Sequence, residues 1–158
     1  MSPDLHPRLH PTALKVQERL QERGLEIEPR VLPDSTRTAV EAAAACGCEL
    51  GQIVKSLVFC DAVTGEPVMC LWAGDRHVPA DELGLRRATA DEARQATGFA
   101  VGGVPPLGHD RPLRTIVDES LRRFDRVWCA AGTPNAVFEV EVSALLAAVG
   151  ASSPDTIA

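Results

Sequence analysis

The chain has 158 residues, of which 45% are hydrophobic and 24% charged, and its 16 basic and 22 acidic residues give a formal net charge of −6. This length suits one domain with a sizeable core, and the composition is typical of a packed globular protein rather than a disordered one. The longest uncharged run, residues 95–109, has 15 residues and contains Gly and Pro, so it is too short and too broken to span a bilayer, which takes about 18 apolar residues. The acidic balance argues against broad, sequence-blind binding to DNA, while a local contact with the end of an RNA stays open.

The opening residues, MSPDLHPRLH, lack the charged head and apolar run of a signal peptide, so we expect a cytoplasmic protein with no membrane segment. Without an export signal, the odd number of five cysteines favours reduced thiols over a disulfide framework. No Cys-x-x-Cys pair occurs, and the four histidines do not supply the spacing of metal ligands. We therefore predict no metal and no cofactor, and expect five thiols that serve as small hydrophobic groups: Cys46, Cys48, Cys60, Cys70 and Cys129.

The first third of the chain predicts two helices on either side of an irregular strand. Residues 11–24 predict an amphipathic helix with a proline in its first turn and a glycine at its end. Residues 26–32 predict a strand that an internal proline weakens. Thr38 and Glu41 have the spacing of a capping box ahead of an alanine-rich helix, and residues 49–54 predict a short helical turn.

The middle of the chain predicts a β-hairpin, in which two runs of β-branched and aromatic residues, 55–61 and 66–74, flank a turn. Residues 75–98 are predicted to be mostly helical, with a second capping box at Thr89 and Glu92. The remaining elements are a loop over 102–109, a strand over 114–117, a short helix over 118–124, strands over 126–132 and 136–142, and a closing helix over 143–150. We therefore predict one mixed α and β domain over residues 1–150 and a C-terminal tail over 151–158.

Only two of the 16 basic residues are lysines, so the composition is strongly biased toward arginine. A lysine that is present despite this bias is a candidate for a functional role that arginine cannot fill. Lys15 lies within the first predicted helix, whereas Lys55 opens the apolar run IVKSLVF. In an extended strand, alternation places Lys55 on the face of Leu57 and Phe59, where its ammonium either reaches water at the strand end or points into a pocket. In a pocket, desolvation lowers the pKa of a lysine, whereas pairing with an anion keeps it charged as an electrostatic clamp.

The loop GGVPPLGH, residues 102–109, is the second candidate site. Gly102 and Gly103 allow the backbone to approach a ligand closely, while Pro105 and Pro106 fix the path of the chain. Such a loop either presents N–H groups to a carbonyl oxygen or phosphate, or simply connects two elements. It lacks the ending of a P-loop and the pattern of a dinucleotide-binding loop.

Other polar residues give weaker signals. His109 lies next to Asp110, but adjacent side chains usually point apart, so we expect a surface histidine rather than an acid–base pair. Asn135, three residues after Gly132, either forms a turn or orients a substrate through its amide. Ser56 lies in no nucleophile elbow, so hydrolysis by a serine nucleophile has little support.

Three segments together make the chain resemble the YbaK/EbsC family of prolyl-tRNA-synthetase-associated editing domains. They are the lysine in QIVKSLVF after a helix that ends in a small-residue glycine turn, the GGVPPLG loop, and the late turn and strand AGTPNAVFEV. Residues 102–106 fit the Gly-x-x-x-Pro loop of the family, and the correspondence covers nearly the whole chain. The resemblance implies an α+β fold in which helices flank a mixed, mainly antiparallel sheet.

The resemblance further implies an aminoacyl-tRNA hydrolase that acts in trans, without a metal, on the 3′ acceptor end of tRNA for proline mischarged with Ala, Cys or Ser. Lys55 would be the functional lysine that holds the terminal nucleotide or the ester region. The free hydroxyl of the terminal ribose would assist attack by water, so no protein nucleophile is required. Backbone contacts to the aminoacyl group would come from a loop and a turn: Gly102, Gly103, Val104, Pro105, Pro106, Gly132 and Asn135. Prolyl-tRNA synthetase is the expected protein partner of a monomer or homodimer.

Two departures from the family leave the amino acid open. The turn reads Gly-Thr-Pro-Asn where some members have a His-Pro turn, and Leu-Gly-His-Asp follows the proline loop where alanine editors differ. Two other functions also stay open: a non-catalytic module that binds a tRNA end or a synthetase, and a hydrolase of a small aminoacyl ester or amide.

Overall fold

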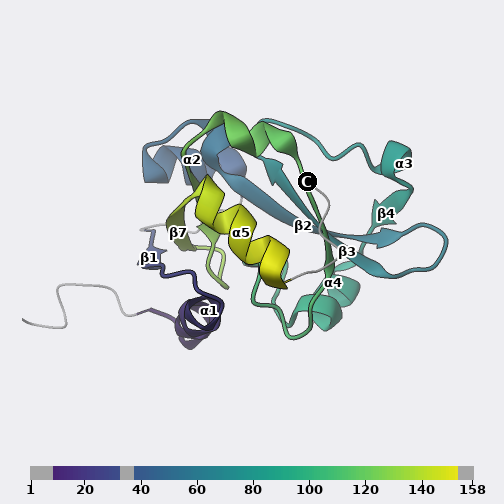
Figure 1. The fold of residues 1–158 in the computed structure, drawn as a ribbon, viewed down its shortest axis with the longest axis horizontal. Helices are drawn as coiled ribbons and strands as arrows, with labels where there is room; N and C mark the ends of the chain where they lie inside the picture. The colour runs from purple at the N-terminus through teal and green to yellow at the C-terminus, as the bar shows by residue number, and fades with distance from the viewer. Residues whose placement is uncertain (1–8, 33–37, 153–158) are drawn as a thin grey trace, which may run out of the picture.

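Two small sheets organise the fold, which is described by a computed structural model over residues 9–32 and 38–152. Within these residues, a four-stranded sheet has the order β4-β2-β3-β5, a three-stranded sheet has the order β1-β7-β6, and five α-helices pack around them (Figure 1). All strand pairs are antiparallel except β3 with β5. The α+β class and the mixed, mainly antiparallel pairing that the family resemblance implied are therefore confirmed.

The four-stranded sheet is built on the predicted hairpin of β2 (Val54–Asp61) and β3 (Pro67–Ala73), which places Lys55 opposite Trp72. The parallel neighbour of β3 is β5 (Arg114–Val117). The outer neighbour of β2 is β4 (Leu85–Arg87), which pairs only with residues 59–61.

The strand β4 lies in a stretch that the sequence predicts to be mostly helical. The helix α3 (Ala80–Leu83) ends after one turn at Gly84, whose φ is 69°. The Gly84 carbonyl then accepts the Ala62 N–H at 2.9 Å, so the chain returns to the sheet for three residues. A strand this short carries too little periodicity to be detected from sequence.

The three-stranded sheet combines β6 (Arg126–Ala130) and β7 (Ala136–Glu141), the two late strands of the prediction, with β1 (Arg30–Val31). The strand predicted over residues 26–32 is thus reduced to two residues. At residue 27 the Gln17 side chain in α1 (Pro11–Glu22) donates to the backbone carbonyl at 3.0 Å, so a helix side chain takes the place of a neighbouring strand. The ladder is extended by the Leu32 N–H, which donates to the Asn135 carbonyl at 2.8 Å.

The predicted helix starts are confirmed by their caps. Thr38 accepts the Glu41 N–H ahead of α2 (Ala39–Cys46), and Thr89 and Glu92 form a reciprocal capping box ahead of α4 (Ala90–Thr97). The predicted short helices at 49–54 and 118–124 are 3₁₀ helices, Leu50–Gln52 and Glu119–Arg123. The closing helix α5 (Val142–Ser152) extends two residues past the expected domain boundary at 150, and residues 153–158 of the expected tail lie outside the described chain. No helix in the described ranges is long and apolar enough to cross a membrane.

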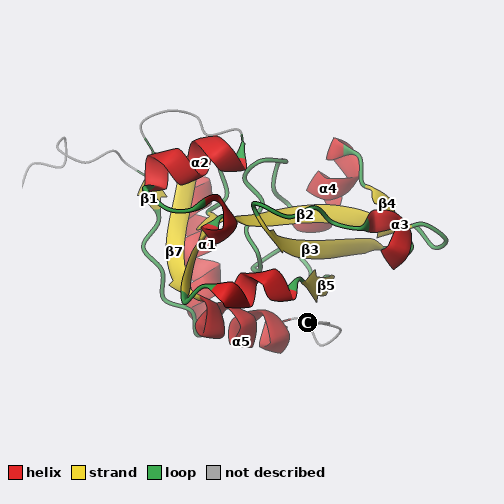
Figure 2. Ribbon diagram, turned by 90° about the horizontal axis from the view of Figure 1, so that it is seen from above, coloured by secondary structure: helices red, strands yellow, loops and turns green. Residues whose placement is uncertain are grey.

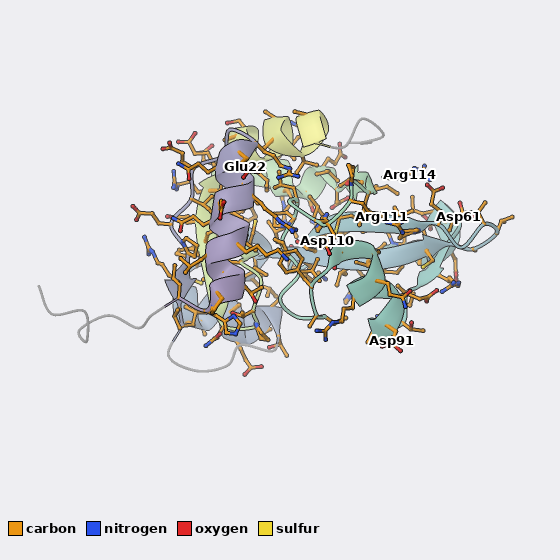
Figure 3. All side chains as sticks on the ribbon, turned by 90° about the horizontal axis from the view of Figure 1, so that it is seen from below. Glu22, Asp61, Asp91, Asp110, Arg111 and Arg114 are labelled. Atoms are coloured by element: carbon orange, nitrogen blue, oxygen red, sulfur yellow. The ribbon has the colours of Figure 1, made fainter. Side chains whose placement is uncertain are left out.

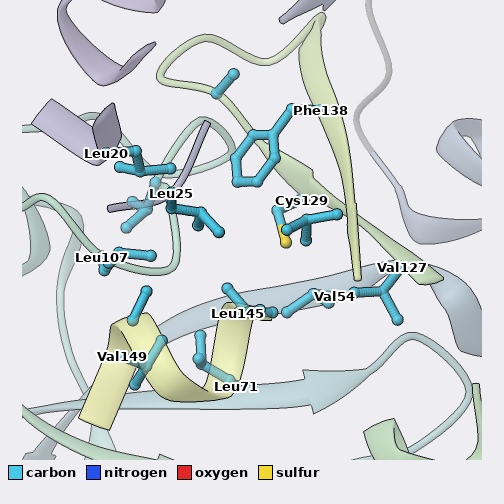
Figure 4. Close-up of a cluster of buried hydrophobic side chains, with 14 of the residues drawn as sticks. Leu20, Leu25, Val54, Leu71, Leu107, Val127, Cys129, Phe138, Leu145 and Val149 are labelled. Atoms are coloured by element: carbon cyan, nitrogen blue, oxygen red, sulfur yellow. The ribbon is translucent and has the colours of Figure 1, made fainter. Parts of the chain in front are cut away.

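The main core lies between the two sheets and joins them to α1 and α5. Leu20 from α1, Leu71 from β3, Phe138 from β7 and Leu145 from α5 are all fully buried in one cluster (Figure 4). In Figure 2 the two sheets are seen at a steep angle, with α5 running below both. Two smaller clusters flank this core, one around Trp128 beneath α2 and one around Phe59 on the outer face of the four-stranded sheet.

His109 is buried, which contradicts the surface position expected for it. Its side chain is 8% exposed and its Nε2 lies 2.7 Å from the Pro105 carbonyl, which can only accept, so Nε2 carries the proton. Burial lowers the pKa of His109 to about 4, although the bond to Pro105 opposes this shift. Asp110 points the other way, toward α1, where its carboxylate pairs with Arg19 at 2.9 Å (Figure 3). The loop is therefore fixed from two sides by adjacent residues, one neutral and buried and one charged and exposed.

Because the pKa of His109 is lowered in the folded state, we predict that the protein loses stability as the pH falls below about 6.5. The histidine of the unfolded chain becomes protonated there, whereas that of the folded protein stays neutral until about pH 4. Between pH 7 and pH 5 this single group should lower the free energy of unfolding by about 2 kcal/mol. His109→Gln retains a donor for the Pro105 carbonyl and does not titrate, so its stability should fall less over the same interval. Urea unfolding of both proteins at the two pH values measures the difference, and equal losses would show that His109 does not carry this dependence.

Candidate functional site

The candidate site lies where the two sheets separate. They meet at one isolated bridge, between Ile53 and Trp128, beyond which β2 and β6 diverge. Because β4 begins to pair only at Phe59, no strand in the described chain pairs with residues 54–58 on this edge of β2. A cavity of about 370 Å³ opens against that edge, within the size range of small-molecule sites.

The open edge of β2 presents backbone groups to the cavity. Asp61 donates its N–H to the Glu66 carbonyl of the hairpin, and backbone groups alternate between the two sides of an antiparallel strand. The N–H and C=O groups of Ser56 therefore point away from β3, toward the cavity edge, between the Ile53–Trp128 bridge and the start of the β4 ladder at Phe59. This edge can bind the polar atoms of a ligand in the way that it would bind a further strand.

The walls of the cavity are mostly apolar. In Figure 2, α2 and α4 lie near opposite ends of the β2 edge, and both contribute small side chains. The polar side chains of the lining are Thr38, Lys55, Ser56 and Arg87. The remaining lining residues come from six segments: Ala39, Ala42, Ile53, Val54, Leu57, Val58, Phe59, Ala88, Ala93, Val101, Gly102, Val104, Trp128, Cys129, Ala130, Pro134 and Val137. No Asp, Glu or His lines the cavity within the described chain.

Lys55 is half-buried and lines the cavity, so the structure places it in a pocket rather than at a free strand end. Its Nζ donates to the backbone carbonyl of Arg76. Burial lowers the pKa of Lys55, and the nearby carboxylate of Asp75 opposes that shift. Asp75 is itself held by two bonds from Arg123, at 2.7 and 3.0 Å. Lys55 therefore carries a positioned positive charge with donors left for a ligand.

The predicted loop divides into residues that line the cavity and residues that support it. Gly102, with a φ of 95°, and Val104 line the cavity. Gly103 is buried against the turn at Gly132, whose N–H donates to the Gly103 carbonyl at 2.8 Å. A Cβ on Gly103 would lie 2.7 Å from the Gly132 carbonyl oxygen, so this approach requires glycine. Pro105 and Pro106 are also buried but are not among the lining residues.

The turn at residues 132–135 supports the site more than it lines it. Gly132 has a φ of 100° and packs on α1, where a Cβ would lie 2.9 Å from Thr12. The Asn135 side chain accepts from the Thr133 hydroxyl at 3.2 Å, and its backbone carbonyl holds Leu32. Neither Gly132 nor Asn135 lines the cavity, whereas Pro134 does. Sequence reasoning missed Pro134, along with Trp128 and Arg87, and no local pattern marks any of the three.

The hydroxyl and thiol groups near the site are not prepared as nucleophiles. Ser56 Oγ is buried without a hydrogen-bond partner in the described chain, on the strand face that Val54 and Val58 direct to the main core. Burial raises the pKa of Cys129, and that of Cys70 to about 12. Burial, then the neighbouring Cys48, raises the pKa of Cys46 to about 11. The residues described hold no cluster of three or more His, Cys, Asp or Glu that could bind a metal ion.

Comparison with known proteins identifies the family. Residues 33–148, more than half of the chain, match the aminoacyl-tRNA editing domain. The uncharacterised protein YwhH of Bacillus subtilis is 30% identical over 112 residues, which cover 67% of this chain and 71% of that protein. The proline–tRNA ligase of Pelobacter propionicus is 29% identical over 108 residues, which cover 64% of this chain but only 18% of the ligase.

A solved structure agrees with these matches. A protein described as a candidate trans-editing enzyme for prolyl-tRNA synthetase is 45% identical and superposes with a TM-score of 0.83, covering 90% of this chain and 94% of that one. Sequence and fold thus lead to the same assignment, and the chain belongs to the aminoacyl-tRNA editing domain family.

Proposed function

We propose that this protein hydrolyses the ester between an amino acid and the 3′ end of a tRNA, and that it acts in trans on tRNA for proline carrying a small, incorrect amino acid. The observation that carries the proposal is the cavity on the open edge of β2, which brings Lys55 together with Gly102 and Val104. The family supports deacylation. The similarity to a proline–tRNA ligase over 18% of that enzyme, and to a candidate trans-editing enzyme, supports the choice of tRNA.

The composition of the lining supports a reaction without a protein base. Hydrolysis joins a water oxygen to the acyl carbon, breaks the bond from that carbon to the ribose oxygen, and leaves the proton on the ribose. The lining offers no carboxylate or imidazole to move this proton, and the Cys129 thiol is protonated because burial raises its pKa. The neighbouring ribose hydroxyl is then the group that relays the proton, while Lys55 stabilises negative charge on the ester or the adjacent phosphate.

The size and polarity of the cavity support a small amino acid. Its walls are formed by side chains such as Ala39, Ala93, Val101 and Val104, which offer apolar contact. The charged residues of the lining, Lys55 and Arg87, are both cations, so the cavity offers no partner for a basic side chain. The rigid part of the loop lies behind this wall rather than in it, so exclusion by size depends on Val101 and Val104 instead of the two prolines.

Lys55 is expected to be required for fast deacylation. Lys55→Ala should slow deacylation roughly 100- to 1,000-fold, the usual cost of losing a positioned group that stabilises developing charge. Lys55→Arg should also be slow, because a planar guanidinium does not replace an ammonium in a narrow pocket. Single-turnover rates on mischarged tRNA measure both effects. The control is Lys15→Ala, which removes the other lysine from the exposed face of α1; near-normal rates in both Lys55 variants would remove that residue from the mechanism.

Catalysis should require neither a metal nor a cysteine of the protein. After exhaustive chelation the deacylation rate should be unchanged, because the lining supplies no ligand cluster. A variant with all five cysteines replaced by Ala or Ser should retain the rate, provided that its melting temperature shows an intact fold. Activity that is lost to the chelator and restored by zinc would contradict this prediction.

Specificity is tested by parallel time courses on alanyl-, seryl-, cysteinyl- and prolyl-tRNA for proline. We expect hydrolysis of the small, incorrect residues and protection of the prolyl ester, because the proline ring and secondary amine fit poorly against the backbone at Gly102–Val104. One extra methylene in a pocket changes binding by only about 1–3 kcal/mol, and steric contact with the wall at Val101 and Val104 should add to this discrimination. Cleavage of prolyl-tRNA as fast as the best alternative would rule out selection by size.

With alanine methyl ester added as a fifth substrate, the same assay separates the two alternative functions. A non-catalytic binding module would bind tRNA and hydrolyse none of the four substrates. A hydrolase of small esters would cleave alanine methyl ester as efficiently as alanyl-tRNA.

A further inference from the structure

Arg87 is a second cation at the cavity, and its neighbour in the chain, Arg86, is neutralised by a carboxylate. Arg86 donates two bonds to the Glu92 carboxylate, each 2.9 Å long. Arg87 is exposed, lines the cavity, and makes no side-chain hydrogen bond or ion pair in the described chain. Adjacent residues of a strand point to opposite faces, so these two arginines face different surroundings.

The strand register places Arg87 on the same face of the sheet as Lys55. Arg87 is opposite Phe59 in the ladder, and Phe59 shares its face of β2 with Leu57 and Lys55 by alternation. The two cations thus mark the ends of one row along the open edge of β2. Leu57, 37% exposed, lies between them, and Val101, 62% exposed, lines the same cavity.

This row matches the chemistry of a nucleotide better than that of a free amino acid ester. Exposed apolar side chains between two cations offer contact for a base and sugar, and a guanidinium binds a phosphate through two parallel bonds. A free aminoacyl ester has no phosphate to bind Arg87. The chain as a whole carries a net charge of −6, so attraction of a polyanion depends on local cations of this kind.

We infer that Arg87 binds a backbone phosphate in the single-stranded 3′ end of the tRNA, and so positions the terminal nucleotide for reaction beside Lys55. This inference rests on the proposed function and extends it to a residue outside the predicted loop and turn. Arg87 acts on binding of the RNA and has no role in proton transfer.

The test compares two substrates that differ in phosphates. Alanyl-tRNA for proline carries the complete 3′ end, whereas 3′-O-alanyl-adenosine ends in a nucleoside without any phosphate. Arg87→Ala should raise KM for alanyl-tRNA about 10- to 100-fold, the usual effect of losing one charge-assisted contact, with little change in kcat. The loss of kcat/KM on alanyl-tRNA should exceed the loss on alanyl-adenosine at least tenfold.

Salt dependence and a matched control complete the test. For alanyl-tRNA, the slope of log(kcat/KM) against log salt should become shallower by about 0.7 in Arg87→Ala, the value for one phosphate contact on a single strand. Arg87→Lys should retain the slope and recover part of the affinity. Arg86→Ala removes the same charge one residue away on the opposite face and should not change the ratio of the two substrates.

Two outcomes would overturn the inference: equal losses on both substrates in Arg87→Ala, or an Arg86→Ala variant as impaired as Arg87→Ala. Failure of the proposed function looks different, because the wild-type protein would then hydrolyse no aminoacyl-tRNA. In that case, binding of uncharged tRNA for proline to wild type, Arg87→Ala and Arg86→Ala decides the question. Unchanged affinity in Arg87→Ala would then refute the contact.

Discussion

The divergence of β2 from β6 beyond the Ile53–Trp128 bridge is the constraint on which the site depends. A strand edge with free N–H and C=O groups usually has to be covered, because it would otherwise pair with another chain. Here β4 covers only residues 59–61, and small side chains from α2, α4 and the loop at 101–104 close around the rest. The cavity therefore results from the sheet topology, because the part of the β2 edge that no strand covers forms its floor.

The second requirement is a loop that holds its shape without a ligand. The contact between Gly103 and Gly132 joins loop and turn by backbone alone, and neither position tolerates a Cβ without displacing its neighbours. His109 holds the Pro105 carbonyl from the interior, and Arg19 binds both Asp110 and the Gly108 carbonyl from α1. Only Gly102 and Val104 of the proline-rich segment are left at the cavity. Such a division between lining and supporting residues fixes the shape of the cavity in the free protein, which would lower the entropic cost of binding a ligand there.

The sequence predicted those elements of the fold that depend on interactions between residues close together in the chain. The caps at Thr38 and Thr89, the β2–β3 hairpin and the late pair of strands were predictable, because capping residues and alternation act over a few neighbours. The two-residue β1 and the three-residue β4 depend on partners distant in sequence. The burial of His109 depends on tertiary packing, and its adjacency to Asp110 gave the opposite expectation.

The residues of the candidate site likewise divide into those that a local sequence pattern marks and those that only the tertiary fold brings to the cavity. Lys55 could be singled out because it interrupts an apolar run, and Gly102 because of the loop it opens. Trp128, Pro134 and Arg87 enter the cavity only because the two sheets separate where they do, and nothing in their immediate sequence marks them. Of the arginines on the surface, Arg19, Arg86, Arg123 and Arg126 are held by carboxylates. The chain carries a net charge of −6, so the proposed recognition of a tRNA has to rely on local cations such as Lys55 and Arg87 at the cavity. Contact limited to an RNA end is weak at physiological salt, and under the proposed function weak contact favours the rapid release that turnover in trans on many tRNA molecules would require.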